Sequence, residues 1–146
     1  MVIGLGADHR GYLMKKKLIE RITAEGHEVK DFGTDSEESV DYPDFAEAVA
    51  REVSKGKVDY GILICKNGIG MSIAANKVKG AYAALVFDME MAEDARIHNN
   101  ANILTFSAER TTLDEASKMF DIWINSKFEG GRHERRFRKI KAIENG

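Results

Sequence analysis

The sequence predicts an α/β fold in which one parallel sheet of five strands lies between two layers of helices. Short apolar runs alternate with longer segments of helical period along the whole chain. Each apolar run ends near glycine or polar residues, as strands do. A length of 146 residues fits one domain that can bury a core without disulfides or metals. We therefore expect residues 1–146 to form a single domain.

Five segments are strand candidates, and helical segments separate them. A strand, a helix and a further strand of the same sheet form a parallel pair with a right-handed crossover, so an open sheet with helices on both faces accounts for the pattern. The candidates are residues 2–7, 28–32, 60–65, 81–86 and 102–106.

Apolar residues recur once per helical turn in the segments between these strands, which is typical of helices that pack by one face. Pro43 suits the first position of a helix, and residues 71–78 can also be helical. The repeating residues are Met14, Leu18 and Ile22, then Phe45, Val49 and Val53, then Leu113, Ala116, Phe120 and Trp123.

Composition argues against several classes of protein. A formal net charge of −2 gives the whole chain no strong attraction to nucleic acid or to an anionic membrane. The four histidines and the single cysteine lack the spacing of a zinc site, and one cysteine cannot form an intrachain disulfide. No apolar run is long enough for a membrane span, and the first residues do not resemble a signal peptide. We expect a cytoplasmic protein without metal, nucleic acid or membrane partners.

Candidate functional residues follow from the predicted fold. In open parallel sheets, ligands bind beyond the carboxyl ends of the strands. The residues directly after each predicted strand are Asp8 and His9, residues 33–42, residues 65–72, Asp88, and residues 107–110.

Cys65 closes the third predicted strand and precedes a glycine turn, residues 66–70 (KNGIG), and a helix start. Glycines let backbone N–H groups point at a ligand, and a helix N-terminus favours an anion or a thiolate. Buried strand-end cysteines are equally common, so position alone leaves a reactive thiol and a core residue as even alternatives. The six-residue dinucleotide pattern is not met, because its last glycine is replaced by Ile73.

Three other groups each have more than one interpretation. Asp8 and His9 form an acid/base pair or a helix cap with a solvated histidine, and position favours the cap. His98, with Asn99 after it, is a general acid or the ordinary end of a helix. In the basic tail, two arginines spaced one turn apart suit a phosphate, a solvated face or a nucleic-acid patch. They are Arg132 and Arg136, with Phe137 and Ile140 directed toward the core.

Five motifs together resemble the type B ribose-5-phosphate isomerases, a family shared with galactose-6-phosphate isomerase subunits. They are GADHRGY, FGTDSEESVDYPDFA, GILICKNGIGMSIAANK, HNNANIL and EGGRHERR, and they extend over almost the whole chain. The resemblance implies a Rossmann-like three-layer αβα fold with a C-terminal helix and no cofactor. It also implies a homodimer with active sites at the subunit interface, with tetramers left open.

The resemblance implies a role for each site residue. Cys65 is the base that moves a proton between C2 and C1 of an open-chain sugar phosphate. His98 opens the furanose ring, with Asp8 assisting at the sugar hydroxyls and Asn99 orienting the chain. Asn67, which stands where the family commonly has a threonine, is the fourth candidate catalytic residue. In this family, Cys65 and His98 of one site need not come from the same chain. The substrate-binding residues are His9, Tyr42, Lys66, Gly68, Ile69, Gly70, Ser72 and Asn99, and the phosphate-binding residues are His9, Arg110, Arg132 and Arg136.

The chain departs from the family pattern at several positions. A second version of the family has a glutamate as base where this chain has Met71, so the chain resembles the cysteine type. Lys66 and Asn67 replace the usual glycine and threonine after the cysteine. Glu109 stands where an arginine commonly contacts the phosphate, with Arg110 one residue along, and Tyr82 replaces another arginine.

The expected function is interconversion of D-ribose 5-phosphate and D-ribulose 5-phosphate through an enediolate. The departures leave open an isomerase of allose 6-phosphate or galactose 6-phosphate, or a phosphosugar-binding module without catalysis. A nucleic-acid binder and a redox sensor at Cys65 are weaker alternatives.

Overall fold

A computed structural model describes residues 1–146 and contains five strands. They are β1 (Val2–Ala7), β2 (Glu28–Asp31), β3 (Tyr60–Cys65), β4 (Ala83–Leu85) and β5 (Ile103–Ser107). All neighbouring strands are parallel, in the order β2-β1-β3-β5-β4. The three inner strands bring the residues that follow β1, β3 and β5 to one edge of the sheet.

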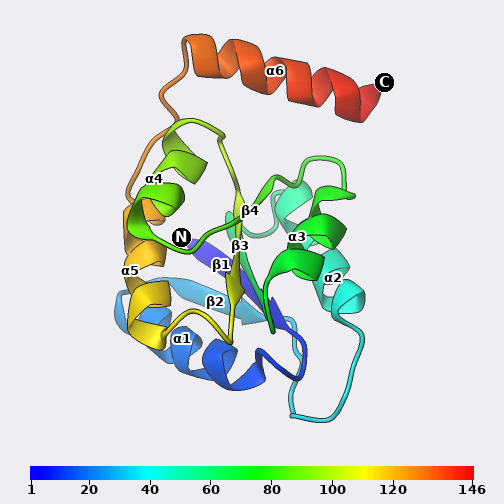
Figure 1. The fold of residues 1–146 in the computed structure, drawn as a ribbon, viewed down its shortest axis with the longest axis vertical. Coiled ribbons are helices and arrows are strands. Elements are labelled where there is room, and N and C mark those ends of the chain that lie inside the picture. The colour runs from blue at the N-terminus through cyan, green and yellow to red at the C-terminus, as the bar shows by residue number, and fades with distance from the viewer.

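Six helices connect and cover these strands: α1 (Tyr12–Ala24), α2 (Tyr42–Ser54), α3 (Ile69–Asn76), α4 (Met89–Ile97), α5 (Leu113–Ile124) and α6 (Arg132–Asn145). Helices α1, α4 and α5 lie on one side of the sheet, and α2 and α3 lie on the other (Figure 1). The predicted three-layer fold with a five-stranded parallel sheet and a C-terminal helix is therefore confirmed.

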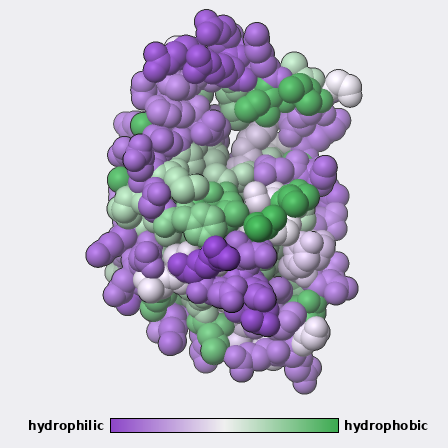
Figure 2. Space-filling view, viewed as in Figure 1, coloured by the Kyte–Doolittle hydropathy of each residue, from purple (hydrophilic) through white to green (hydrophobic).

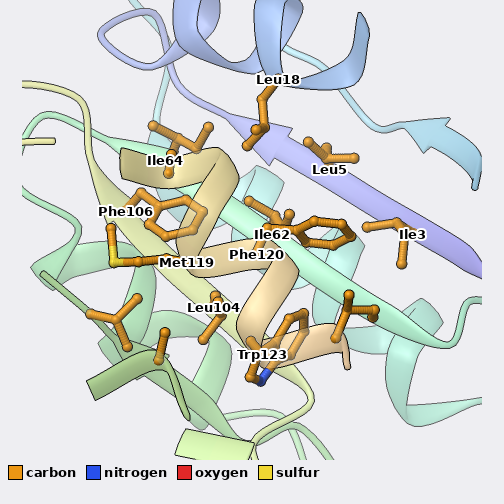
Figure 3. Close-up of a cluster of buried hydrophobic side chains, with 14 of the residues drawn as sticks. Ile3, Leu5, Leu18, Ile62, Ile64, Leu104, Phe106, Met119, Phe120 and Trp123 are labelled. Atoms are coloured by element: carbon orange, nitrogen blue, oxygen red, sulfur yellow. The ribbon is translucent and has the colours of Figure 1, made fainter. Parts of the chain in front are cut away.

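Two apolar layers hold the sheet between the helices. Side chains alternate along a strand, so Ile62 and Ile64 face α1, α4 and α5, whereas Leu63 and Cys65 face α2 and α3. Figure 3 shows the first layer, where Phe120 and Trp123 of α5 pack against the central strands. The same alternation directs the Cys65 side chain toward the start of α3.

Several predicted boundaries differ from the structure for local reasons. The predicted strand at residues 81–86 shrinks to the three residues of β4, because β4 is an edge strand that pairs with β5 alone. β2 ends at Asp31, whose carboxylate accepts the N–H of Gly33 as the chain turns. β5 extends to Ser107, which pairs with Cys65, and α3 begins at Ile69 rather than at residue 71.

Helix α6 lies outside the three layers, at one end of the molecule (Figure 1). Phe137 is buried, but Ile140 is 46% exposed and Ile143 is 81% exposed. The prediction that Ile140 faces the core is therefore wrong, because α6 has no core layer beneath that residue. Figure 2 shows a largely hydrophilic outer side of this helix and apolar side chains along its inner edge. None of the helices combines the length and apolar composition that a bilayer crossing needs.

Candidate active site

The carboxyl ends of β1 and β3 place Asp8 beside Cys65. The two strands are neighbours, and the Asp8 N–H donates to the Ile64 carbonyl at 3.2 Å. Both side chains line one cavity of about 350 Å³, as the predicted topology requires. The other lining residues are Tyr42, Lys66, Asn67, Ile69, Gly70 and Ile73.

Cys65 is 5% exposed, and its sulfur accepts a hydrogen bond from the Gly68 N–H at 3.2 Å. Gly68 is the N-cap of α3 and has a left-handed backbone with φ of 79°. This conformation favours glycine and turns the N–H back toward the sulfur. A donor at a helix N-terminus stabilises negative charge on a thiolate, so the geometry suits a reactive sulfur.

The Asn67 side chain binds a backbone group of its own loop. Its Oδ1 accepts the N–H of Ile69 at 3.0 Å, which fixes the orientation of the amide, and its Nδ2 donors make no hydrogen bond within the chain. The backbone N–H groups of Asn67 and Gly70 donate to no atom of the chain. These two backbone donors remain for an oxyanion at this end of the cavity.

Asp8 closes the turn before α1 and also has a carboxylate oxygen directed to the cavity. Its Oδ1 accepts the N–H groups of Arg10 at 2.9 Å and Gly11 at 3.1 Å, so it closes the turn before α1, although Gly11 is the N-cap residue. Its Oδ2 makes no hydrogen bond within the chain, and the side chain lines the Cys65 cavity. The Nδ1 of the adjacent His9 accepts the N–H of Val40 at 3.2 Å, which leaves Nε2 as the donor in the neutral ring.

Tyr42 and Gly70 are packed against each other at the wall of the cavity. A Cβ atom added to Gly70 meets the Tyr42 ring at 2.5 Å, so the ring occupies the space that a side chain needs. Ser72 lies in the first turn of α3, where its N–H donates to the Gly68 carbonyl. Met71, at the position where the second version of the family has its glutamate base, is fully buried.

The Lys66 backbone holds the loop to the end of β5. Its carbonyl accepts the Ser107 hydroxyl at 2.8 Å and the N–H of Glu109 at 3.1 Å. The Lys66 side chain itself is exposed, and so is Arg110, whose N–H donates to the Ser107 hydroxyl at 3.0 Å. The structure thus places Arg110 at the same edge of the sheet as Cys65.

A second cluster forms where α4 ends and α6 begins. His98 is the C-cap of α4, as the helix-end interpretation expects. It lies 3.5 Å from Asp94 and 4.0 Å from Glu129. Its imidazole stacks on that of His133. A cavity of about 240 Å³ is lined here by His98, Asn99, His133, Arg136, Phe137 and Ile140.

His133 was not among the predicted site residues. It is 8% exposed, and its Nε2 has no hydrogen-bond partner. Burial lowers the pKa of His133, and the nearby charges of His98 and Arg132 lower it further. The sequence does place a histidine there, because position 133 lies between Arg132 and Arg136 in the RHERR run.

The two clusters are separate within one chain. Their cavities share no residue, and His98 precedes β5 whereas Cys65 ends β3, so they belong to opposite edges of the sheet. Arg132 is exposed at the first position of α6. Each cluster holds part of the predicted site, and one chain does not bring the two parts together. No group of three or more His, Cys, Asp or Glu side chains is arranged to hold a metal ion.

Comparison with known proteins gives consistent results. The family model described as Ribose/Galactose Isomerase matches residues 3–140. The chain is 42% identical to ribose-5-phosphate isomerase B of Escherichia coli (strain K12), over 97% of this chain and 95% of that protein. It is 44% identical to a probable ribose-5-phosphate isomerase B of Mycoplasma genitalium, over 97% of this chain and 95% of that protein.

Solved structures are equally similar. The ribose-5-phosphate isomerase B of Clostridium thermocellum superposes with a TM-score of 0.98 at 48% identity, covering 99% of this chain and 98% of that chain. The enzyme from Mycoplasma genitalium with bound ribulose-5-phosphate gives a TM-score of 0.94 at 43% identity, covering 99% and 96%. With its predicted fold, its thiol-containing cavity and these matches, the chain belongs to the ribose/galactose isomerase family.

Proposed function

We propose that this protein is an aldose–ketose isomerase that interconverts D-ribose 5-phosphate and D-ribulose 5-phosphate. The observation that supports this most strongly is the Cys65 sulfur at the end of β3, with the Gly68 N–H donating to it and the Asp8 carboxylate lining the same cavity. Relatives that match nearly end to end have this activity in their names, and one was solved with bound ribulose-5-phosphate.

In the proposed reaction, the Cys65 thiolate removes the proton from C2 of the open-chain aldose. The electron pair of that bond forms the C1–C2 double bond of an enediolate, and the carbonyl π pair moves to the C1 oxygen. The proton of the C2 hydroxyl moves to the C1 oxygen, which becomes the C1 hydroxyl. The C2 oxyanion then re-forms a carbonyl, and the electron pair of the C1–C2 double bond takes the proton from the Cys65 thiol at C1, which regenerates the thiolate. The free N–H groups of Asn67 and Gly70 stabilise the developing oxyanion.

The remaining loop residues bind the sugar. Asp8 has one free carboxylate oxygen for a hydroxyl, and Tyr42 forms the wall of the cavity. Lys66, Gly68, Ile69, Gly70 and Ser72 complete the loop and the first turn of α3 around the chain of the substrate. Asn67 contributes its Nδ2 donors, and the hydrogen bond from the Ile69 N–H to its carbonyl oxygen fixes the orientation of the amide.

We infer that the active unit is a homodimer in which each site is shared. His98 opens the furanose ring, and Asn99 orients the sugar, but both line a cavity that is separate from that of Cys65 within one chain. In a two-fold dimer, each contact between the chains occurs twice. If the Cys65 half-site of one chain meets the His98 half-site of its partner, the dimer therefore has two complete sites. The exposed Ile69, Ile73, Ile140 and Ile143 supply apolar surface for such an interface.

The phosphate is bound by cations from both parts of the shared site. Arg136 lines the cavity of His98, and Arg132 is one turn earlier on α6, so both guanidinium groups can approach one phosphate in forked geometry. His9 offers its Nε2, and Arg110 stands at the edge of the sheet where Cys65 lies. Glu109 is exposed there, and we assign it no contact with the phosphate.

The test is turnover of ribose 5-phosphate by the purified protein and by Cys65→Ala. Removing a general base lowers kcat by about 10²–10⁴-fold, so the variant should lose nearly all activity while still binding the substrate. Allose, galactose and glucose 6-phosphates are assayed in parallel. Turnover of a hexose phosphate without the pentose would change the substrate assignment, and binding without turnover of any sugar would favour a phosphosugar-binding module.

A further inference from the structure

Helix α6 contacts the rest of the chain near its two ends and, between them, through Phe137. At its first turn, the His133 ring stacks on His98. Near its middle, Phe137 packs edge-on against Tyr82, with ring centroids 4.8 Å apart. In its last turn, both oxygens of the Glu144 carboxylate are bound: Oε2 accepts the Tyr82 hydroxyl at 2.8 Å, and Oε1 accepts the Gly80 N–H at 2.9 Å.

The residues that bind Glu144, Gly80 and Tyr82, are themselves hydrogen-bonded to the segment that begins β5. The Tyr82 N–H donates to the Asn102 side chain at 2.8 Å, and the Tyr82 carbonyl accepts the N–H groups of Asn102 and Ile103. The Asn102 amide in turn donates to the Gly80 carbonyl at 2.9 Å. Residues 80–82 are therefore held to the start of β5 by hydrogen bonds that do not involve α6.

The two kinds of contact restrain α6 differently. Apolar contacts such as that of Phe137 fix which face of the helix meets the body, but they tolerate small rotations and small shifts along the helix axis. A carboxylate bound by two donors fixes both, because hydrogen bonds to a charged group are short and directional. Glu144 is eight residues after Arg136, about 12 Å along the helix, so a shift of Glu144 along the helix axis also shifts the arginines.

We propose that Tyr82 and Glu144 are positioning residues for the substrate phosphate. The hydrogen-bonded pair sets the position of α6, and through it the positions of Arg132 and Arg136 relative to His98 and Asn99. Loss of the pair weakens phosphate binding without altering the chemical step at Cys65. This inference rests on the proposed role of the two arginines in binding phosphate.

Burial and the hydrogen bond to Glu144 raise the pKa of Tyr82 to about 12. The phenol therefore stays protonated and remains a donor to Glu144 at every pH at which the enzyme is assayed. The Tyr82 hydroxyl is therefore a constant donor in this contact.

The experiment compares Tyr82→Phe and Glu144→Ala with the full-length parent protein. A matched control is Glu134→Ala, which removes another α6 carboxylate whose only ion pair is with Arg138 on the same helix. We expect KM for ribose 5-phosphate and the inhibition constant of inorganic phosphate to rise together by about tenfold in Tyr82→Phe, which loses one hydrogen bond to a charged group, and by at least as much in Glu144→Ala, which loses two. We expect kcat to stay within about twofold, and the control to change neither constant.

A purely structural role predicts a different result. It would lower the thermal midpoint and leave the inhibition constant of phosphate unchanged, which would overturn the proposal, as would a fall in kcat at constant KM. Arg136→Gln separates the proposal from its premise. If this variant binds phosphate normally, the assigned phosphate site is wrong. If it binds phosphate weakly while Tyr82→Phe and Glu144→Ala do not, only the positioning role is wrong.

Discussion

The imidazole rings of His98 and His133 are stacked, with centroids 4.2 Å apart and planes inclined by 14°. This contact joins the end of α4 to the first turn of α6 and forms one wall of the cavity that Arg136 also lines. Two stacked imidazoles that both bear a proton repel each other. The contact is therefore sensitive to acid.

We predict that acid weakens the docking of α6 through His133. Its pKa in the folded protein is lowered from the ordinary value of 6.5, first by burial and then by His98 and the two neighbouring arginines, although Glu129 opposes them. A depressed histidine pKa means that the unfolded chain binds more protons, so this contribution to stability is complete above about pH 6.5 and is lost as the pH falls below it. His133→Asn should reduce the loss of the thermal midpoint on acidification. An NMR titration that places His133 at or above its ordinary value would contradict this.

A second prediction concerns Gly68, whose N–H donates to the Cys65 sulfur. Gly68 and Gly56 have similar left-handed backbones, with φ of 79° and 73°. A Cβ atom at Gly56 meets nothing within 4 Å, whereas at Gly68 it lies 2.5 Å from the Leu85 side chain. Gly56→Ala should thus cost about 1 kcal/mol of unfolding free energy from backbone strain alone. Gly68→Ala should cost about 2 kcal/mol more, because it adds a clash in a packed region.

Urea denaturation of both glycine variants measures the difference. Gly68→Ala should also lower kcat, since moving the Gly68 N–H removes the hydrogen bond to the sulfur. Gly56 lies in the turn after α2, away from both cavities, so its variant should keep the parent kcat. Equal losses of stability in the two variants would show that the neighbours of Gly68 move aside.

The part of the site at the sheet edge was predictable because it depends on strand order and side-chain alternation. Apolar runs located the ends of β1 and β3, and a parallel sheet necessarily brings Asp8 and Cys65 to one edge. The Asn67 contact to the Ile69 N–H was not predicted, because an amide side chain has both donors and acceptors and only coordinates show which of them is occupied.

The part of the site on α6 was less predictable. Its position depends on contacts between residues distant in the sequence, such as Tyr82 with Glu144, and periodicity contains no information about such pairs. The same limit explains the error at Ile140. An apolar residue one turn from a buried Phe137 suggests a core, yet α6 lies outside the layers, and its apolar edge is open in the single chain.

We predict that a site assembled from two chains can be recovered by mixing two defective ones. Cys65→Ala and His98→Asn are each expected to impair turnover strongly. If the two residues of a site come from different chains, a mixed dimer has one site with both defects and one intact site. Mixed dimers, purified with two different affinity tags, should therefore regain about half of the parent activity per dimer. If both residues of a site come from one chain, every site keeps one defect and no activity returns.

The last prediction concerns an ion pair between a buried lysine of α1 and a half-exposed aspartate at the end of β2. The Lys15 ammonium contacts the Asp31 carboxylate at 2.6 Å, and their side chains are 1% and 42% exposed. Asp31→Ala leaves a buried ammonium without a partner and should lower the unfolding free energy by about 3 kcal/mol. Lys15→Met leaves a half-exposed carboxylate that keeps the Gly33 N–H and regains water, and a chain of similar volume fills the space. Its cost should be about 1 kcal/mol.

The double variant Lys15→Met with Asp31→Ala distinguishes an unpaired buried charge from lost packing as the cause. If the charge is the cause, removing the lysine as well should restore stability close to that of Lys15→Met, measured by urea denaturation of all three variants. If lost packing around Asp31 is the cause, the two costs should add. A loss for Lys15→Met as large as that for Asp31→Ala would show that the carboxylate, not the ammonium, is the group that depends on the pair.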